Sequence, residues 1–400
     1  MTYQVFKSPC DLDADTWDQL AHPSLYLSSG WLRARSRTVK ASEHFILTSG
    51  ADGYPLASAP CYLSTDKAHP GYAPARLLGF DDLSEAEYLE SAQELDAITR
   101  YRAMLMEQGG AWNPAFVVGA PGRYGGISVR AGLHGNQAAA ARNGLIDAVE
   151  QQAAEVGARS ISWLYFVEGE DLPLEQMLIE RGYARLILDA ECYMPIRWNN
   201  FDEYLANFRN EYRGTVKHEM EVLDAAGVKV DMHGAEILGP ELAALERQWR
   251  LKYGRTPPLE EIVADYEELR SCMADSLRVF VATLDGRAIG FAVFLEENNI
   301  WYSRFGGFDY SAGNLFLYFN LLFYRPIQTM IERGAISARY SLKSYLAKRS
   351  RGCLLRNVLA FVKAPEGWPS MTPAIQAINA VQTLRFSKIS SKRITKEEVA

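Results

Sequence analysis

The stretch LRVFVATLDGRAIGFAVFLEENNIWYSRFGGFD, residues 277–309, determines the fold that the sequence predicts. Its apolar and β-branched runs are interrupted by Asp285-Gly286, a dipeptide typical of tight hairpin turns. We expect three or four antiparallel strands here. A helix at about 314–333 and a strand at 335–342 follow. The pattern therefore predicts an α+β unit built on a central hairpin.

The first half of the chain repeats this order of elements. Its predicted elements are a hairpin at 43–64, a strand at 115–121, an Ala-rich helix at 136–157 and a strand at 160–166. Since the two halves share this order, we expect a duplicated unit with an N-terminal domain at 1–198 and a C-terminal domain at 199–400.

The composition disfavours several classes of protein. The 400 residues contain 42 Lys and Arg against 49 Asp and Glu, a net charge of −7, which is unlike a protein coated with nucleic acid. The sequence has no secretory signal and no apolar run of about 18 residues, so we expect a cytoplasmic protein without a membrane span. The cysteines and histidines are dispersed, and neither a zinc ligand set nor a Gly-x-Ser-x-Gly motif occurs. Metal and covalent mechanisms are therefore disfavoured.

Positive charge is concentrated behind the predicted helix at 314–333. Eight Lys or Arg and no acidic residue occur from Arg333 to Lys363. Two interpretations stay open: a solvated basic face, or a patch that binds phosphates with salt-dependent affinity. In the second interpretation, the interleaved Tyr340 and Tyr345 could stack on exposed bases.

The helix itself carries a polar stripe beside its apolar one. Asn320 and Tyr324 are spaced i, i+4 and so lie on one face. This stripe either packs as the polar edge of a helix on a sheet or lines an acyl channel. Pro326 lacks a backbone N–H and is expected to kink the helix.

Residues 277–342 resemble the core of the GNAT acyltransferase superfamily, with its central hairpin, long helix and following strand in the same order. The stretch FYRPIQTMIERG followed by KRSRG is similar to the Fem-like branch, in which two such domains occur in tandem. The residues that match the Fem-like pattern are Tyr324, Ile327, Ile331, Glu332, Gly334, Lys348, Arg351 and Gly352. The Gly-rich segment with Glu-His that precedes the lysine in that pattern is replaced here by SLKSYLA.

The resemblance implies an α+β fold with a mixed sheet, in which two tandem GNAT-like domains pack side by side and the C-terminal one carries the donor site. It implies an N-acyltransferase that moves an aminoacyl group from aminoacyl-tRNA to the amine of a small molecule or peptide. Aminoacyl-tRNA is then a cosubstrate, and no further cofactor is expected. Two alternatives remain: an enzyme that uses acyl-CoA or a carrier-protein thioester, and a non-catalytic binding protein with the same fold.

The match to the Fem-like lysine makes Lys348 the leading catalytic candidate, with an ammonium that meets a developing oxyanion or a substrate carboxylate. The other candidate catalytic residues are Lys343, Arg304 and Tyr324. The candidate donor-binding residues are Arg349, Arg351, Arg356, Arg339, Tyr345 and Asn320. A Lys348→Met substitution is expected to lower turnover on the order of 100-fold with an unchanged melting temperature, whereas a surface lysine would matter only a few-fold.

Two segments are candidates for the loop in which ordinary GNAT enzymes hold the CoA pyrophosphate at a helix N-terminus. DYSAGNLF (309–316) has one glycine and a leading Asp, which makes it a poor phosphate cradle. RYGGIS (123–128) could bind phosphate through Arg123, Gly125 and Gly126. A plain tight loop is the alternative for this second segment.

Overall fold

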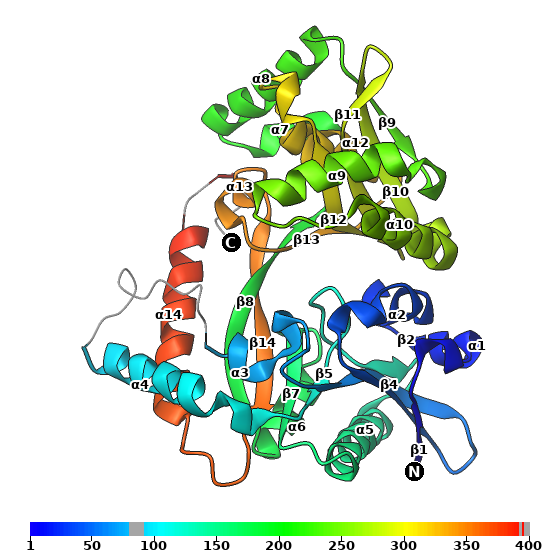
Figure 1. The fold of residues 1–400 in the computed structure, drawn as a ribbon. Helices are drawn as coiled ribbons and strands as arrows, with labels where there is room; N and C mark the ends of the chain where they lie inside the picture. The colour runs from blue at the N-terminus through cyan, green and yellow to red at the C-terminus, as the bar shows by residue number, and fades with distance from the viewer. Residues whose placement is uncertain (80–91, 392–393, 396–400) are drawn as a thin grey trace. The chain divides into compact units, whose positions relative to one another are not determined.

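The computed structural model describes residues 1–79, 92–391 and 394–395, which form two compact units (Figure 1). The first unit contains Met1–Ala190 and Asn357–Ser387, and the second contains Glu191–Arg356 and the residues from Lys388 onward. The units differ from the expected ranges 1–198 and 199–400 chiefly because a late segment belongs to the first unit. Those ranges stay a prediction about domains.

The first unit is built on a mixed sheet. Its strands are β1 (Thr2–Phe6), β2 (Leu20–Ala21), β3 (Ser42–Ser49), β4 (Pro55–Ser64), β5 (Ala115–Val118), β6 (Ser128–Arg130), β7 (Ser160–Val167), the first part of β8 (Ala184–Pro195) and most of β14 (Leu354–Lys363). Strands β1, β3, β4, β5, β7 and β14 are neighbours in that order. The pair β5–β7 is parallel and the other pairs along this path are antiparallel. Strand β6 pairs with both β2 and β4.

Helices and short helical turns connect these strands. The helices are α1 (Ala14–Asp18), α2 (Ser29–Arg35), α3 (Pro74–Leu77), α4 (Ala92–Gln108), α5 (Gly135–Glu155), α6 (Leu172–Glu180) and most of α14 (Thr372–Ser390). Helix α5 joins the parallel strands β5 and β7, as a crossover connection between parallel strands requires.

The second unit has the same kind of sheet. Its strands are the end of β8, then β9 (Lys229–His233), β10 (Leu277–Leu284), β11 (Arg287–Glu297), β12 (Ile300–Phe308) and β13 (Ser337–Leu342), in the spatial order β8-β13-β12-β11-β10-β9. Its helices are α7 (Phe201–Asn207), α8 (Asn210–Ala225), α9 (Pro240–Lys252), α10 (Leu259–Met273), α11 (Leu317–Phe319), α12 (Arg325–Glu332) and α13 (Tyr345–Arg349). The parallel pair is β12–β13. A mixed α/β fold is therefore confirmed.

The stretch 277–309 forms three antiparallel strands, β10, β11 and β12, as predicted. Asp285 and Gly286 both have positive φ, 51° and 79°, which is the geometry of the tight turn that the dipeptide favours. Apolar side chains of these strands are buried, and Phe294 packs edge-on against Trp301 with ring centroids 6.0 Å apart. The hairpin thus supplies the core of the second unit.

The helix predicted at 314–333 is interrupted. It consists of α11, a π-helical turn at Asn320–Tyr324 and then α12. Pro326 lies in the first turn of α12, where a missing N–H is tolerated. The wide π turn before it absorbs the break that the proline imposes. Such turns are frequent at functional sites.

Candidate functional site

The sheet of the second unit opens between its two parallel strands. Pairing of β12 with β13 runs from Ile300–Ser337 to Tyr302–Arg339 and then stops, although β12 continues to Phe308. A register shift between β11 and β12 leaves Arg304 as an additional residue just beyond the last of these pairs. Backbone groups of β12 past this point are not used by β13. A ligand can therefore approach the sheet there.

Lys348 lies in α13 and is buried, with 8% of its surface exposed. Its Nζ atom donates hydrogen bonds to the carbonyl oxygens of Tyr340 at 2.5 Å, Leu342 at 2.9 Å and Ser341 at 3.3 Å. The ammonium thus holds the end of β13 in place. The expectation of a flexible ammonium that reaches out to a substrate is wrong for this arrangement, because all three of its donors already have backbone acceptors.

The turn that Lys348 holds has an unusual backbone. Ser341, Lys343 and Ser344 have φ angles of 59°, 66° and 54°, which place three non-glycine residues in the left-handed region. Such conformations persist only where the surroundings fix them, and they cluster at functional sites. Lys343, the second candidate catalytic lysine, is part of this turn and is half-buried.

Arg351 forms a buried cluster with Glu219 of α8 and Tyr324 of the π turn. Its Nη2 atom donates to both Glu219 carboxylate oxygens at 2.6 and 2.7 Å, and its Nε donates to the Tyr324 hydroxyl oxygen at 2.5 Å. The Tyr324 hydroxyl in turn donates to Glu219. The Arg351 guanidinium carbon lies 3.7 Å from the centroid of the Phe319 ring. Tyr324 and Arg351 thus stabilise the helix break from inside.

Asn320 begins the π turn and is fully buried. Its Nδ2 atom donates to the main-chain oxygens of Glu219 at 3.0 Å and Phe316 at 3.2 Å. Its Oδ1 atom has no hydrogen-bond partner within the described residues. The structure therefore brings Asn320 and Tyr324 together around Glu219, as their i, i+4 spacing predicts.

Arg339 and Arg349 of the basic run are also buried, and Arg356 is half-buried, whereas Arg333 is exposed. Arg339 donates to both carboxylate oxygens of Glu191, at 2.8 and 3.1 Å, and Arg356 donates to the same carboxylate at 2.7 Å. Burial alone would raise the pKa of Glu191, but the two guanidinium groups outweigh it and hold the pKa below its ordinary value. Arg349 donates to the carbonyl oxygens of Cys353 and Ser390 at 2.9 and 3.0 Å.

These contacts correct the interpretation of the run as an exposed phosphate-binding patch. Arg339, Arg349 and Arg351 are buried, and their charges face carboxylates and carbonyls of the same unit. Tyr345 is also buried and cannot stack on a nucleotide from solvent. The alternative of a solvated basic face is wrong for the same residues.

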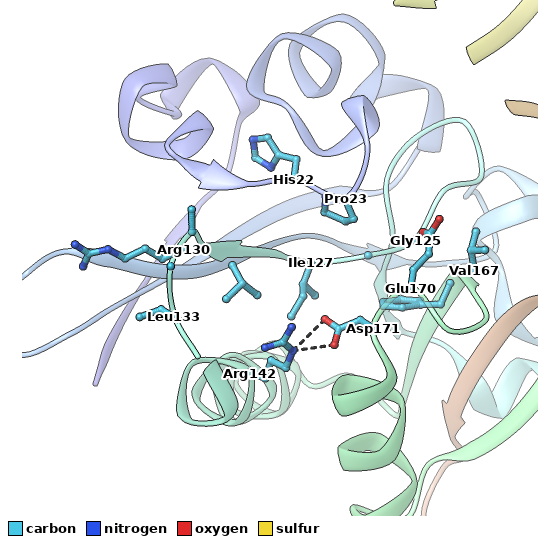
Figure 2. A pocket seen from close by; sticks show the side chains of 15 residues that line it. His22, Pro23, Gly125, Ile127, Arg130, Leu133, Arg142, Val167, Glu170 and Asp171 are labelled. Atoms are coloured by element: carbon cyan, nitrogen blue, oxygen red, sulfur yellow. Dashed lines mark hydrogen bonds and ion pairs between the residues drawn. The ribbon is translucent and has the colours of Figure 1, made fainter. Parts of the chain in front are cut away.

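The first unit contains a cavity of about 350 Å³ (Figure 2). Gly125 and Gly126 of the candidate phosphate loop line it, together with His22, Arg142 and Asp171. Figure 2 shows Arg142 and Asp171 paired at one side, where Arg142 Nε donates to both carboxylate oxygens at 2.8 and 3.0 Å. The charges of this pair balance each other, so the pair adds no net attraction for an anion.

Gly125 is required by packing and not by phosphate. A Cβ atom at this position would lie 2.3 Å from the carbonyl oxygen of Leu164 in β7, and the Gly125 N–H donates to the carbonyl of Tyr165 at 2.7 Å. Its N–H is thus not directed at a ligand. The Arg123 N–H donates to the Tyr72 hydroxyl at 2.9 Å. The geometry therefore favours the tight-loop alternative.

His22 borders the cavity and is held on both ring nitrogens. Its Nδ1 lies 2.5 Å from Ser128 Oγ and its Nε2 lies 3.2 Å from Asp18 Oδ1. Burial would raise the pKa of Asp18, but hydrogen bonds from His22 and Ser29 outweigh it and lower the pKa. The ionised carboxylate and the Ser128 hydroxyl thus orient the imidazole from its two ring nitrogens. Because Ser128 is buried, the arrangement orients an imidazole and does not present a serine nucleophile.

The acidic partners in these clusters escaped the sequence analysis. Glu219 precedes Arg351 by 132 positions and Glu191 precedes Arg339 by 148. Nothing in the local sequence marks either glutamate as the partner of a distant arginine. Asp18 and His22 are spaced i, i+4, which is a detectable signal, but Ser128 lies 106 positions further on.

Comparison with known proteins explains the architecture. A family model described as FemAB-like, peptidoglycan biosynthesis/recognition, matches residues 99–338. The chain belongs to this family. A comparison with curated protein sequences gave no significant match. The family assignment confirms the predicted Fem-like resemblance, the tandem GNAT-like fold and the acyltransferase class.

Solved structures share the fold at low sequence identity. FemX aligns with a TM-score of 0.60 and 13% identity over 95% of this chain and 100% of its own. A conserved protein of unknown function from Bacteroides thetaiotaomicron aligns with a TM-score of 0.55 and 12% identity, over 90% and 100%. A C-terminal domain assigned to a lysylphosphatidylglycerol synthetase of Agrobacterium fabrum aligns with a TM-score of 0.52 and 10% identity, over 93% and 96%.

Within the described residues, no helix combines the length and apolar character that crossing a membrane demands. The same part of the chain holds no group of three or more His, Cys, Asp or Glu side chains arranged to bind a metal ion.

Proposed function

We propose that this protein is a Fem-like N-acyltransferase that transfers an aminoacyl group from aminoacyl-tRNA to an amine of a small molecule or peptide. The match of the FemAB-like family model to residues 99–338 carries the proposal, because it includes the first-unit cavity loop and most of the second-unit sheet. Family members named for peptidoglycan biosynthesis make a peptide amine a natural acceptor class.

The proposed reaction is the attack of an amine on an ester. The amine nitrogen bonds to the ester carbonyl carbon, the bond from that carbon to the ribose oxygen breaks, and a proton from the amine passes to the leaving ribose oxygen, which becomes a hydroxyl. Such a reaction depends on orientation and on polar groups that are fixed before the oxyanion develops. Lys348 contributes by fixing the turn at the end of β13, which lies on one side of the opening between β12 and β13.

The two loops that could hold a CoA pyrophosphate support a donor other than CoA. In the second unit, the buried Asp309 carboxylate accepts from the Ser311 N–H at 2.9 Å and the Ser311 hydroxyl at 2.5 Å. These hydrogen bonds and the Arg287 guanidinium, whose Nη2 lies 3.4 Å from Oδ2, lower the pKa of Asp309, so the Ser311 N–H serves this carboxylate and is not free for a phosphate. In the first unit, the Gly125 N–H is already used by Tyr165.

The test uses the purified full chain with radiolabelled aminoacyl-tRNAs and a panel of acceptors that includes peptidoglycan-precursor peptides. Ester-linked label on tRNA is released by mild base, whereas an amide product keeps it. We expect base-stable label that depends on both acceptor and intact tRNA and is abolished by prior RNase treatment. A parallel reaction contains acyl-CoA and a thiol indicator. Release of CoA thiol in the absence of RNA would contradict the proposal and establish the thioester donor.

A further inference from the structure

We propose that an exposed surface at the end of α9 binds the single-stranded 3′ end of the tRNA donor. We define this α9 surface as Arg247, Lys252, Tyr253, Arg255 and Tyr310. The inference rests on the proposed function and adds a location for the donor, which the buried arginines of the 333–363 run leave unassigned.

The α9 surface is positively charged. Arg247, Arg250, Lys252 and Arg255 occur within nine residues that contain no acidic side chain. Arg250 is neutralised by Glu246, whose Oε1 atom accepts from it at 2.5 Å. The other three cations are exposed. Each cation that neutralises a phosphate releases counterions, so the surface is expected to bind a polyanion with salt-dependent affinity.

Exposed aromatic rings lie among these cations. Tyr253 is 64% exposed and Tyr310 is 47% exposed. Lys252 Nζ lies 4.3 Å from the centroid of the Tyr310 ring, and Trp249 packs against Tyr253 with centroids 5.4 Å apart. Aromatic rings interleaved with cations are the usual platform for unpaired bases, because every base has a face that can stack. A surface that binds only a double-stranded nucleic acid would need the cations but not the exposed aromatic rings.

The α9 surface is mounted rigidly on the sheet. A Cβ atom at Gly307 in β12 would lie 2.3 Å from the backbone nitrogen of Glu246, so α9 touches the strand directly. The buried Glu246 carboxylate also accepts from the Tyr266 hydroxyl of α10 at 2.5 Å. The side chains of the surface are therefore presented from a fixed helix, which limits the ordering cost on binding.

The surface lies at the open end of the second-unit sheet. Tyr310 follows β12 almost directly, eight positions after Tyr302, the last β12 residue that pairs with β13. Inward from it, Tyr318 packs on Phe308 with centroids 6.0 Å apart. Burial raises the pKa of Tyr318 to about 12, and both Cys353 and Tyr253 contribute to the rise. Tyr318 also packs on Phe319 with ring centroids 5.2 Å apart, and the Arg351 guanidinium carbon lies 3.7 Å from the Phe319 ring, so aromatic rings connect the end of β12 with the buried Arg351 region.

Acidic residues of helix α10 limit the α9 surface on one side. It lies next to α9 (Figure 1) and carries Glu260 and Glu261 in its first turn and Asp265 further along. These carboxylates repel phosphates. The nucleotide backbone is therefore expected on the Arg247, Lys252 and Arg255 side.

The experiment measures binding and transfer with the full chain. Fluorescence anisotropy gives the affinity for uncharged tRNA and for the same tRNA without its single-stranded 3′ nucleotides, at several salt concentrations. The variants are Arg247→Ala/Arg255→Ala, Tyr253→Ala and Tyr310→Ala. The matched controls are Arg100→Ala and Tyr54→Ala, exposed residues of the first unit. Tyr54, at 57% exposure, also lies next to an arginine, with Arg130 5.1 Å from its ring.

We expect each aromatic variant to weaken binding about tenfold for intact tRNA and hardly at all for the truncated one. The double arginine variant should weaken binding of both and lower the salt slope by about two. In the transfer assay, KM for aminoacyl-tRNA should rise with little change in kcat. Melting temperatures of all variants should match the parent, since these side chains are exposed.

Three outcomes would separate the two proposals. Transfer from aminoacyl-tRNA with KM unchanged within twofold in every variant would overturn the α9 surface and leave the proposed function intact. tRNA binding that the variants weaken as expected, without any transfer by the parent, would uphold the surface and overturn the reaction. A parent protein that binds no tRNA would overturn both.

Discussion

Arg351 Nη2 donates to both carboxylate oxygens of Glu219, at 2.6 and 2.7 Å, and both side chains of this ion pair are buried. The pair ties the segment after α13 to α8 and encloses the Tyr324 hydroxyl of the π turn. Arg351, one of the cations of the basic run Arg333–Lys363, is thus neutralised inside the fold. The charges of the buried Arg339, Arg349 and Arg351 therefore organise the second unit and are not presented to a ligand.

Removing the carboxylate charge of Glu219 should lower the free energy of unfolding. Glu219→Gln leaves a buried guanidinium without its counterion, which typically costs about 3–5 kcal/mol. We expect a loss of that size in the free energy of unfolding, measured with urea. Glu221→Gln changes an exposed glutamate on the same helix and should have little effect. Equal stabilities for the two variants would contradict the role assigned to Glu219.

Lys348→Met is now expected to lower stability as well as turnover. The sequence alone suggested an unchanged melting temperature, but the structure shows the ammonium bonded to three carbonyl oxygens. A hydrogen bond to a charged group contributes about 1.5–3 kcal/mol, so a loss of roughly 2 kcal/mol or more is expected. Thermal unfolding gives the answer, with the half-buried Lys343→Met as the comparison. A fully active variant with an unchanged melting temperature would show that Lys348 neither holds the turn nor takes part in the reaction.

The free energy of unfolding at acid pH should depend on the ionisation of Glu191. Its pKa is lowered in the folded state by Arg339 and Arg356, so its contribution is present above the unfolded pKa of about 4.5 and is lost as pH falls through the folded value. Urea unfolding between about pH 3 and 6 should show a decline at the acid end. Glu191→Gln should be less stable at neutral pH and lose part of that decline. The exposed Glu180→Gln should retain it.

Gly125→Ala tests whether the cavity loop is a packing device. The new methyl group would meet the Leu164 carbonyl oxygen at 2.3 Å, and backbone cannot yield cheaply. We expect a loss of about 2 kcal/mol or more. Gly110→Ala adds the same methyl group where no atom lies within 4 Å and should change stability by less than about 0.5 kcal/mol. A stable Gly125→Ala variant with weakened phosphate binding would instead revive the phosphate loop.

The order of elements was predictable because it depends on local signals. Asp285-Gly286 specifies a hairpin turn by its backbone preferences alone, and the apolar runs around it specify the strands. The interruption at Asn320–Tyr324 was only partly predictable. Pro326 predicts an interruption of the helix, but the form of the interruption depends on Glu219 and Arg351, which lie on other elements.

The candidate site was harder to predict because its decisive property is burial. Lys348 and Arg351 have identical charges whether they face solvent or a carboxylate, so a count of cations cannot distinguish the two situations. The exposed cations of α9 are interleaved with Trp249, Tyr253 and Leu251, which makes the segment look like an ordinary amphipathic helix end. Only the packing of α9 on β12 shows which of these side chains remain outside.

Strand β14 and helix α14 have a consequence for synthesis of the chain. The first unit needs Asn357–Ser387, yet the ribosome makes the whole of Glu191–Arg356 before it reaches them. At about 5–20 residues per second this interval lasts on the order of ten seconds or longer. During it, the apolar strand β7 lacks the partner that β14 later supplies along Val358–Lys363. An unpaired apolar strand edge is a template for aggregation. The nascent protein is therefore prone to aggregation until Asn357–Ser387 has been made.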